Sequence, residues 1–94
     1  MTYRETMEAA RQYDISSTKL YVAEEFESLV AGADLAMSED VFETACSKIE
    51  RAYLKSEDLS INAIATAMLY ALLDNNTLED IDIHYLIAEA CYFN

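Results

Sequence analysis

Apolar residues recur every three or four positions along most of this chain, a spacing that places them on one face of an α-helix. The pattern breaks at short polar stretches, several of which hold a serine or threonine of the kind that caps a helix. We therefore predict five helices joined by short loops. Their expected ranges are about residues 3–13, 19–31, 39–55, 61–73 and 78–92.

Some residues mark the ends of these helices. Thr2 and Glu5 have the three-residue spacing of a capping box, which predicts that the first helix begins beside them. Thr77 and Asp80 repeat that spacing and predict the start of the last helix. Gly32 is the single glycine, and we expect it to end the second helix, with a loop over residues 33–37.

The composition supports an all-α fold. The chain has no proline and one glycine, so it lacks most of the turn residues that β-hairpins need. Its 94 residues are 53% hydrophobic, enough for one core but too few residues for two. We predict one helical domain over residues 1–94, a compact bundle of four to five short helices.

Two helices have unusual apolar faces. Residues 61–73 are apolar nearly all round, which places that helix in the centre of the bundle. The last helix is expected to have two apolar faces, of which only one can enter the core, so the other would need more core or a partner. The first face is Leu78, Ile81, Tyr85, Ala88 and Tyr92, and the second is Ile83, Leu86, Ile87 and Ala90.

The net charge of −12 changes the range of partners that we expect. No lysine or arginine follows Lys55, although seven carboxylates do. An acidic surface is repelled by phosphate, so we expect no direct binding to nucleic acid or to an anionic membrane. No apolar run is long enough to cross a membrane. We expect a soluble, cytoplasmic protein whose partners are basic or apolar.

Catalytic and metal-binding signatures are missing from the sequence. His84 is the only histidine, and no paired Glu-x-x-His motif accompanies it. Cys46 and Cys91 lie beside apolar or acidic residues, so we expect reduced, buried and unreactive thiols. A single glycine excludes a glycine-rich phosphate loop. We therefore expect no enzyme activity, no cofactor and no metal site.

Lys48, Arg51 and Lys55 form a small basic stripe in the later turns of the third helix. The negative end of a helix dipole favours cations there, and acidic residues are nearby. We prefer that explanation to phosphate binding.

Many of the carboxylates fall at helix starts, where the helix dipole accounts for them. The others predict an acidic surface that presents carboxylates to a basic cleft. Tyrosines supply contact area with a polar tip, and Tyr21 lies off the apolar stripe of its helix. We expect the binding face to contain Tyr21, Glu24, Glu25, Glu27, Asp34, Glu39, Asp40 and Glu43.

These residues suggest two functions. The small size, strong acidity and absence of enzyme motifs resemble the inhibitors that phages and mobile elements encode, including anti-CRISPR proteins and DNA mimics. That resemblance rests on composition and covers the whole chain. It implies an inhibitor that occupies the basic surface of a nucleic-acid-handling enzyme. The alternative is a homodimeric interaction or assembly protein that uses the second apolar face of the last helix.

Overall fold

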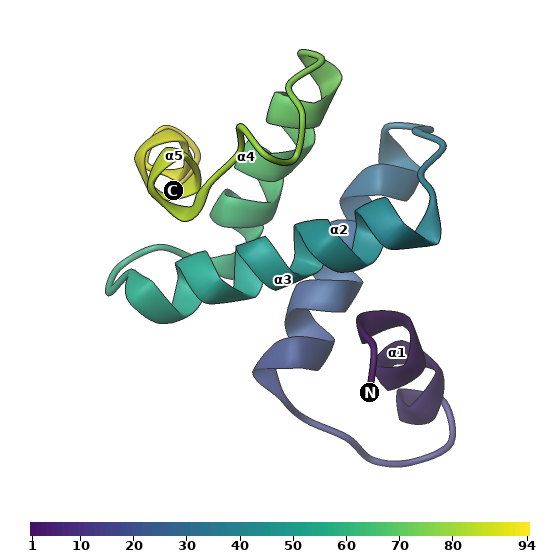
Figure 1. Ribbon diagram of the computed structural model, residues 1–94. Coiled ribbons are helices and arrows are strands. Elements are labelled where there is room, and N and C mark those ends of the chain that lie inside the picture. The colour runs from purple at the N-terminus through teal and green to yellow at the C-terminus, as the bar shows by residue number, and fades with distance from the viewer.

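Five helices and no strand make up the computed structural model, which describes residues 1–94 (Figure 1). The predicted all-α bundle is therefore confirmed. In chain order the helices are α1 Tyr3–Ala10, α2 Thr18–Gly32, α3 Glu39–Lys55, α4 Ile61–Leu73 and α5 Ile83–Ala90.

Helix α4 connects the parts of the bundle, since it packs against α2, α3 and α5. In Figure 1 α3 crosses α2, while α1 and α5 lie toward opposite sides of the molecule. Helix α1 packs on α2 and α3, and α5 packs on α3 and α4. The two short terminal helices thus cover different regions of one core.

The interior confirms that α4 is central. Ile64 and Met68 of α4 are fully buried together with Phe26 and Ile49 from the two neighbouring helices. Burial of each such side chain stabilises the fold by about 1.5–3 kcal/mol. The polar residues of α4 face outward, as Asn62 does. Helices α2, α3 and α5 together provide the apolar surroundings that the sequence predicts for α4.

The capping box at the start of α1 is present. The Thr2 hydroxyl accepts the Glu5 N–H at 3.0 Å, and the Glu5 carboxylate accepts the Thr2 N–H at 2.8 Å. The bond from the Thr2 backbone N–H, followed by interaction with the Thr2 side chain, stabilises the carboxylate and lowers the pKa of Glu5. The helix ends at Ala10 rather than at the predicted Tyr13. Residues 11–14 are all exposed, so no packing contact stabilises a further turn.

Helix α2 ends at Gly32 and a loop follows it, as predicted, but the residue that takes the left-handed conformation is Asp34. Gly32 keeps a negative φ inside the helix, whereas Asp34 has φ 53°. The N–H of Leu35 bonds the carbonyl of Val30 at 3.2 Å, which is the signature of a Schellman motif. Asp tolerates this backbone region better than most residues, so a glycine is not required there.

The last helix begins later than the capping-box spacing predicts. Thr77 donates its hydroxyl to the Asp80 carboxylate at 3.0 Å, and residues 78–80 form a turn. Asp82 instead caps α5, accepting the N–H of Tyr85 at 2.8 Å. Ile81, just before the cap, is fully buried. Because the chain passes through the core at Ile81 in a non-helical conformation, the helix begins only after this residue.

Residues of the predicted second face of the last helix enter the core, as Ile81 of the first face also does. Leu86 and Ala90 are fully buried, and Ile83 and Ile87 pack against the core with part of their surface exposed. By contrast Tyr92, from the first face, is 83% exposed and lies beyond the helix. The predicted oligomer face is therefore wrong for Leu86 and Ala90, which have no surface left for a partner.

Candidate functional site

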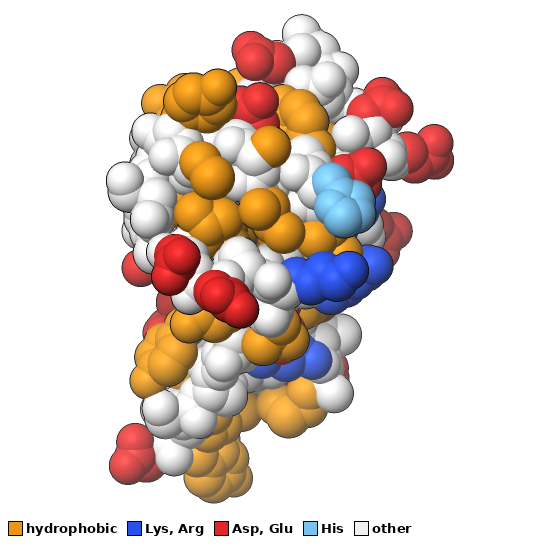
Figure 2. Space-filling view, turned by 90° about the vertical axis from the view of Figure 1, so that its left-hand side faces the viewer, with side chains coloured by type: hydrophobic (Ala, Val, Ile, Leu, Met, Phe, Trp, Pro, Cys, Tyr) orange, Lys and Arg blue, Asp and Glu red, His pale blue; other side chains and the backbone are white.

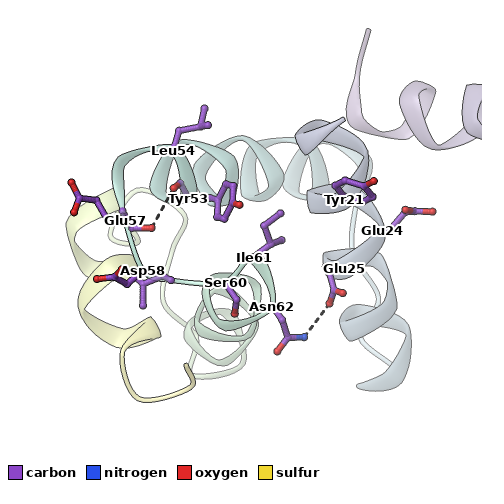
Figure 3. Close-up of a pocket in the computed structure, with 12 residues that line it drawn as sticks. Tyr21, Glu24, Glu25, Tyr53, Leu54, Glu57, Asp58, Ser60, Ile61 and Asn62 are labelled. Atoms are coloured by element: carbon purple, nitrogen blue, oxygen red, sulfur yellow. Dashed lines mark hydrogen bonds between the residues drawn. The ribbon is translucent and has the colours of Figure 1, made fainter. Parts of the chain in front are cut away.

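An open groove of about 710 Å³ lies between α2 and the segment that joins α3 to α4 (Figure 3). The last turns of α3 and the first turn of α4 complete its walls. Twelve residues line it, namely Tyr21, Glu24, Glu25, Tyr53, Leu54, Ser56, Glu57, Asp58, Leu59, Ser60, Ile61 and Asn62.

The groove carries negative charge on both sides. Figure 3 shows Glu25 on α2 pointing into the groove, while Glu24 on α2, and Glu57 and Asp58 in the α3–α4 connection across from it, project outward from the rim. No lysine, arginine or histidine lines the groove, so its four carboxylates have no positive partner there. Their combined field attracts cations toward one concave surface, where low-dielectric walls strengthen it.

Apolar and aromatic side chains occupy the space between these acids. Tyr53 and Ile61 lie there in Figure 3, while Leu54 projects from the outer side of α3. Leu54 is 68% exposed and Tyr21 is 49% exposed. The Tyr21 hydroxyl bonds that of Ser16 at 2.7 Å, which restrains its ring. The groove thus combines charge with apolar contact area, a composition suited to binding another protein.

Hydrogen bonds hold the groove wall in place. Ser60 caps α4 through the N–H of Ala63, at 3.1 Å. The side-chain amide of Asn94 accepts the Ser60 N–H at 3.1 Å and donates to the Asp58 carbonyl at 3.2 Å. Residues from the end of the chain therefore fix the loop that carries Glu57 and Asp58, and little ordering would be needed on binding.

The structure divides the predicted acidic face into separate groups. Tyr21, Glu24 and Glu25 come together in the groove. Glu25 also accepts a hydrogen bond from Asn62 at 3.0 Å. Asp34 and Asp40 are exposed but do not line the groove.

The remaining three predicted acids, Glu27, Glu39 and Glu43, surround Arg4. The Arg4 guanidinium lies 3.5 Å from Glu27 and 3.4 Å from Glu39. Glu43 accepts two backbone N–H groups at the start of α1, from Tyr3 at 2.7 Å and from Arg4 at 2.9 Å. These acids attach α1 to α2 and α3, so their main role is in the fold.

The α3–α4 side of the groove could not be expected from sequence spacing alone. Glu57 and Asp58 precede a predicted helix start, where the helix dipole accounts for them, and Tyr53 has the three-to-four-residue spacing of the apolar residues of α3. The groove contains all three. One signal was present in the sequence, because Leu54 is a large apolar residue outside that spacing and precedes the acids Glu57 and Asp58 by about one turn.

The two cysteines differ in environment. Cys46 is buried as predicted, and burial, followed by the negative charge of Glu43, raises the pKa of its thiol to about 12. Cys91 is exposed, which contradicts the expected burial, and its thiol donates to the Ile87 carbonyl at 3.3 Å. A thiol that stays protonated, as Cys46 does, is a poor nucleophile.

Tyr3 also has a raised pKa, because its hydroxyl is buried and donates a hydrogen bond to Glu50.

Histidine, cysteine and acidic side chains nowhere assemble into a group of three that could hold a metal ion. None of the five helices combines the length and apolar character needed to cross a membrane. Comparison of the chain with protein-family models, with curated protein sequences and with solved structures finds no match. Its function therefore has to be inferred from the groove and the other surface features.

Proposed function

We propose that this protein binds a positively charged segment of a partner protein in the groove between α2 and the α3–α4 connection. The observation that carries the proposal is the gathering of four carboxylates and two tyrosines around one concave surface that has no basic side chain. Carboxylates that serve only solubility would be spread over the surface rather than concentrated in a groove beside exposed apolar residues.

The groove suits arginine better than lysine. A guanidinium bonds a carboxylate through two parallel N–H groups, and its flat face stacks on aromatic rings. Glu24 and Glu25 could receive such a group on one side while Tyr21 supplies a ring beside it. Leu54 at the rim would add apolar contact with the surrounding surface of the partner.

The partner that we propose is a nucleic-acid-handling enzyme, which this protein would inhibit by covering its basic nucleic-acid-binding surface. Such a surface binds nucleic acid, which is a polyanion, and this protein is also strongly negative, with a net charge of −12 in 94 residues. Long-range attraction between the two would give fast association that slows as salt rises.

The groove is tested by binding of a labelled arginine-rich peptide, measured by fluorescence anisotropy over a range of salt concentrations. The test variant is Glu24→Gln, Glu25→Gln, Glu57→Gln and Asp58→Asn combined, which leaves a formal charge of −8. Four carboxylates at roughly 9 Å from one bound cationic group together contribute about 1.4 kcal/mol in water at about 0.01 M salt, and about 0.6 kcal/mol at about 0.15 M salt. We expect about tenfold weaker binding at low salt and about threefold weaker binding at the higher salt.

The matched control removes four exposed acids outside the groove, Glu8→Gln, Asp14→Asn, Asp74→Asn and Glu79→Gln, and also reaches −8. We expect it to bind the peptide within about twofold of the unmodified protein, because these carboxylates are screened from the groove. Equal losses in both variants would show that net charge alone drives binding and would refute a role for the groove.

The proposed inhibition needs a second measurement. A photoreactive residue at position 54 can capture the partner in a lysate, and the captured protein can then be purified and tested for nucleic-acid binding. We expect this protein to displace nucleic acid from it, and the groove variant to fail at the same concentration. A partner that has no basic nucleic-acid-binding surface would contradict the inhibitor hypothesis.

A further inference from the structure

A second hollow of about 320 Å³ lies between the later turns of α3 and the start of α5. It contains half of the six lysines and arginines of the chain together with its only histidine. On the face shown in Figure 2 the histidine lies beside lysine and arginine side chains. The lining residues are Lys48, Arg51, Lys55, Asp82, Ile83 and His84.

These cations are not used in ion pairs, because the salt bridges of this protein both belong to Arg4. The Lys48 ammonium donates to the carbonyls of Leu78 at 2.6 Å and Ile81 at 3.2 Å. An ammonium has three N–H groups, so one remains for a ligand. The carbonyl bonds fix Lys48 beside the start of α5, while exposed Arg51 has no partner.

The first turn of α5 adds backbone donors to the same hollow. Its N–H groups from Ile83 and His84 have no acceptor within the protein. The one carboxylate in the lining, Asp82, is occupied by the N–H of Tyr85. The hollow therefore offers the positive end of a helix dipole next to several cationic side chains.

The helix dipole of α3 alone does not account for this arrangement. It favours cations near the end of α3, but three cations share the hollow with only one carboxylate, Asp82, which caps the start of α5. The excess positive charge would stabilise a bound anion. With three cations and one acid the lining has a formal charge of +2 when His84 is neutral.

We propose that this hollow binds a single phosphate group, carried by a small molecule. Arginine and backbone N–H groups match tetrahedral phosphate oxygens, and the hollow has room for the phosphate and part of the group it is attached to. A small ligand is favoured over a nucleic acid, because the overall charge of −12 repels a long polyanion. The site is separate from the acidic groove and does not depend on its function.

The test is a titration of the full chain with inorganic phosphate and with phenyl phosphate, followed by ¹H–¹⁵N NMR at constant ionic strength. We expect saturable shifts concentrated in the amides of Ile83 and His84 and in the Arg51 side chain. Acetate at the same ionic strength should produce much smaller shifts, since it lacks the tetrahedral oxygens. Equal responses to acetate and phosphate, or none to either phosphate compound, would overturn the proposal.

Two matched variants separate the site from general charge. Arg51→Gln should weaken phosphate binding about fivefold, while Arg11→Gln, which removes another exposed arginine that does not line the hollow, should leave it unchanged. Both residues are exposed, so circular dichroism should show intact folds. Equal weakening by the two variants would show non-specific attraction and would overturn the site, as would binding of duplex DNA without binding of phosphate.

Discussion

Replacement of Glu43 by alanine should destabilise the protein by about 2 kcal/mol, more than loss of an exposed acid that makes no hydrogen bond. Glu43 lies on α3, yet its carboxylate accepts the N–H groups of Tyr3 and Arg4 in the first turn of α1. No residue of α1 can replace it, because Thr2 already serves a different N–H, that of Glu5. The variant would leave two helix-terminal donors without a protein partner.

The magnitude follows from those two bonds. A hydrogen bond to a charged acceptor contributes about 1.5–3 kcal/mol when it is buried. Glu43 is half-buried, so water can replace part of each bond, and we discount the sum to about 2 kcal/mol. For a domain of this size a loss of 1 kcal/mol lowers the melting temperature by about 4–8 °C. We therefore expect a decrease of about 8–16 °C.

The assay is thermal and urea unfolding followed by circular dichroism, with Asp40→Ala as the control. Asp40 lies one turn earlier on α3 and is exposed, with no bond to its carboxylate, so its loss should cost less than about 0.5 kcal/mol. If Glu43→Ala were as stable as the control, the carboxylate would not hold α1 in place. Glu43 would then be free for the acidic binding surface that the sequence suggested.

Three further predictions concern other residues. Asp34→Gly should stabilise the protein by about 0.5–1 kcal/mol in urea unfolding, since glycine adopts φ 53° without strain; a loss would mean that the aspartate side chain is needed there. Leu86→Ala should cost about 2–5 kcal/mol and Leu54→Ala less than about 0.5 kcal/mol, because only Leu86 is buried; equal costs would contradict the core assignment. Near neutral pH a thiol reagent should label Cys91 rapidly and Cys46 only on unfolding. The folded state keeps the Cys46 proton up to a pKa of about 12, whereas the unfolded chain releases it near 9.0, so stability should fall as the pH rises between those values. A urea midpoint that did not change across this range would contradict the raised pKa.

The sequence by itself determined the helical class, the central position of α4 and most helix starts. These features depend on local physics, namely three-to-four-residue apolar spacing and hydroxyl or carboxylate groups that cap a neighbouring N–H. Ser60 illustrates this, since it bonds a donor only three residues away. Such contacts are formed within one turn, so reading the chain in order is enough to find them.

Tertiary structure decided the features that depend on contacts between distant segments. Thr77 and Asp80 have the spacing of a capping box, but burial of Ile81 moved the start of α5 to Asp82. The shift made the predicted partner face part of the core. Similarly, spacing along α2 and α3 could not show that Glu43 would be drawn to α1.

The two candidate sites have the same origin. Glu24 and Asp58 are distant in sequence, as are Arg51 and His84, and packing brings each pair to the lining of one hollow. Local sequence attributes Glu57, Asp58 and the cations of α3 to nearby helix ends, because the dipole acts over about one turn, whereas it already predicts Glu24 and Glu25 to face a partner. Only the folded arrangement reveals which charges remain next to one another without a partner, and these residual charges are the basis of both proposals.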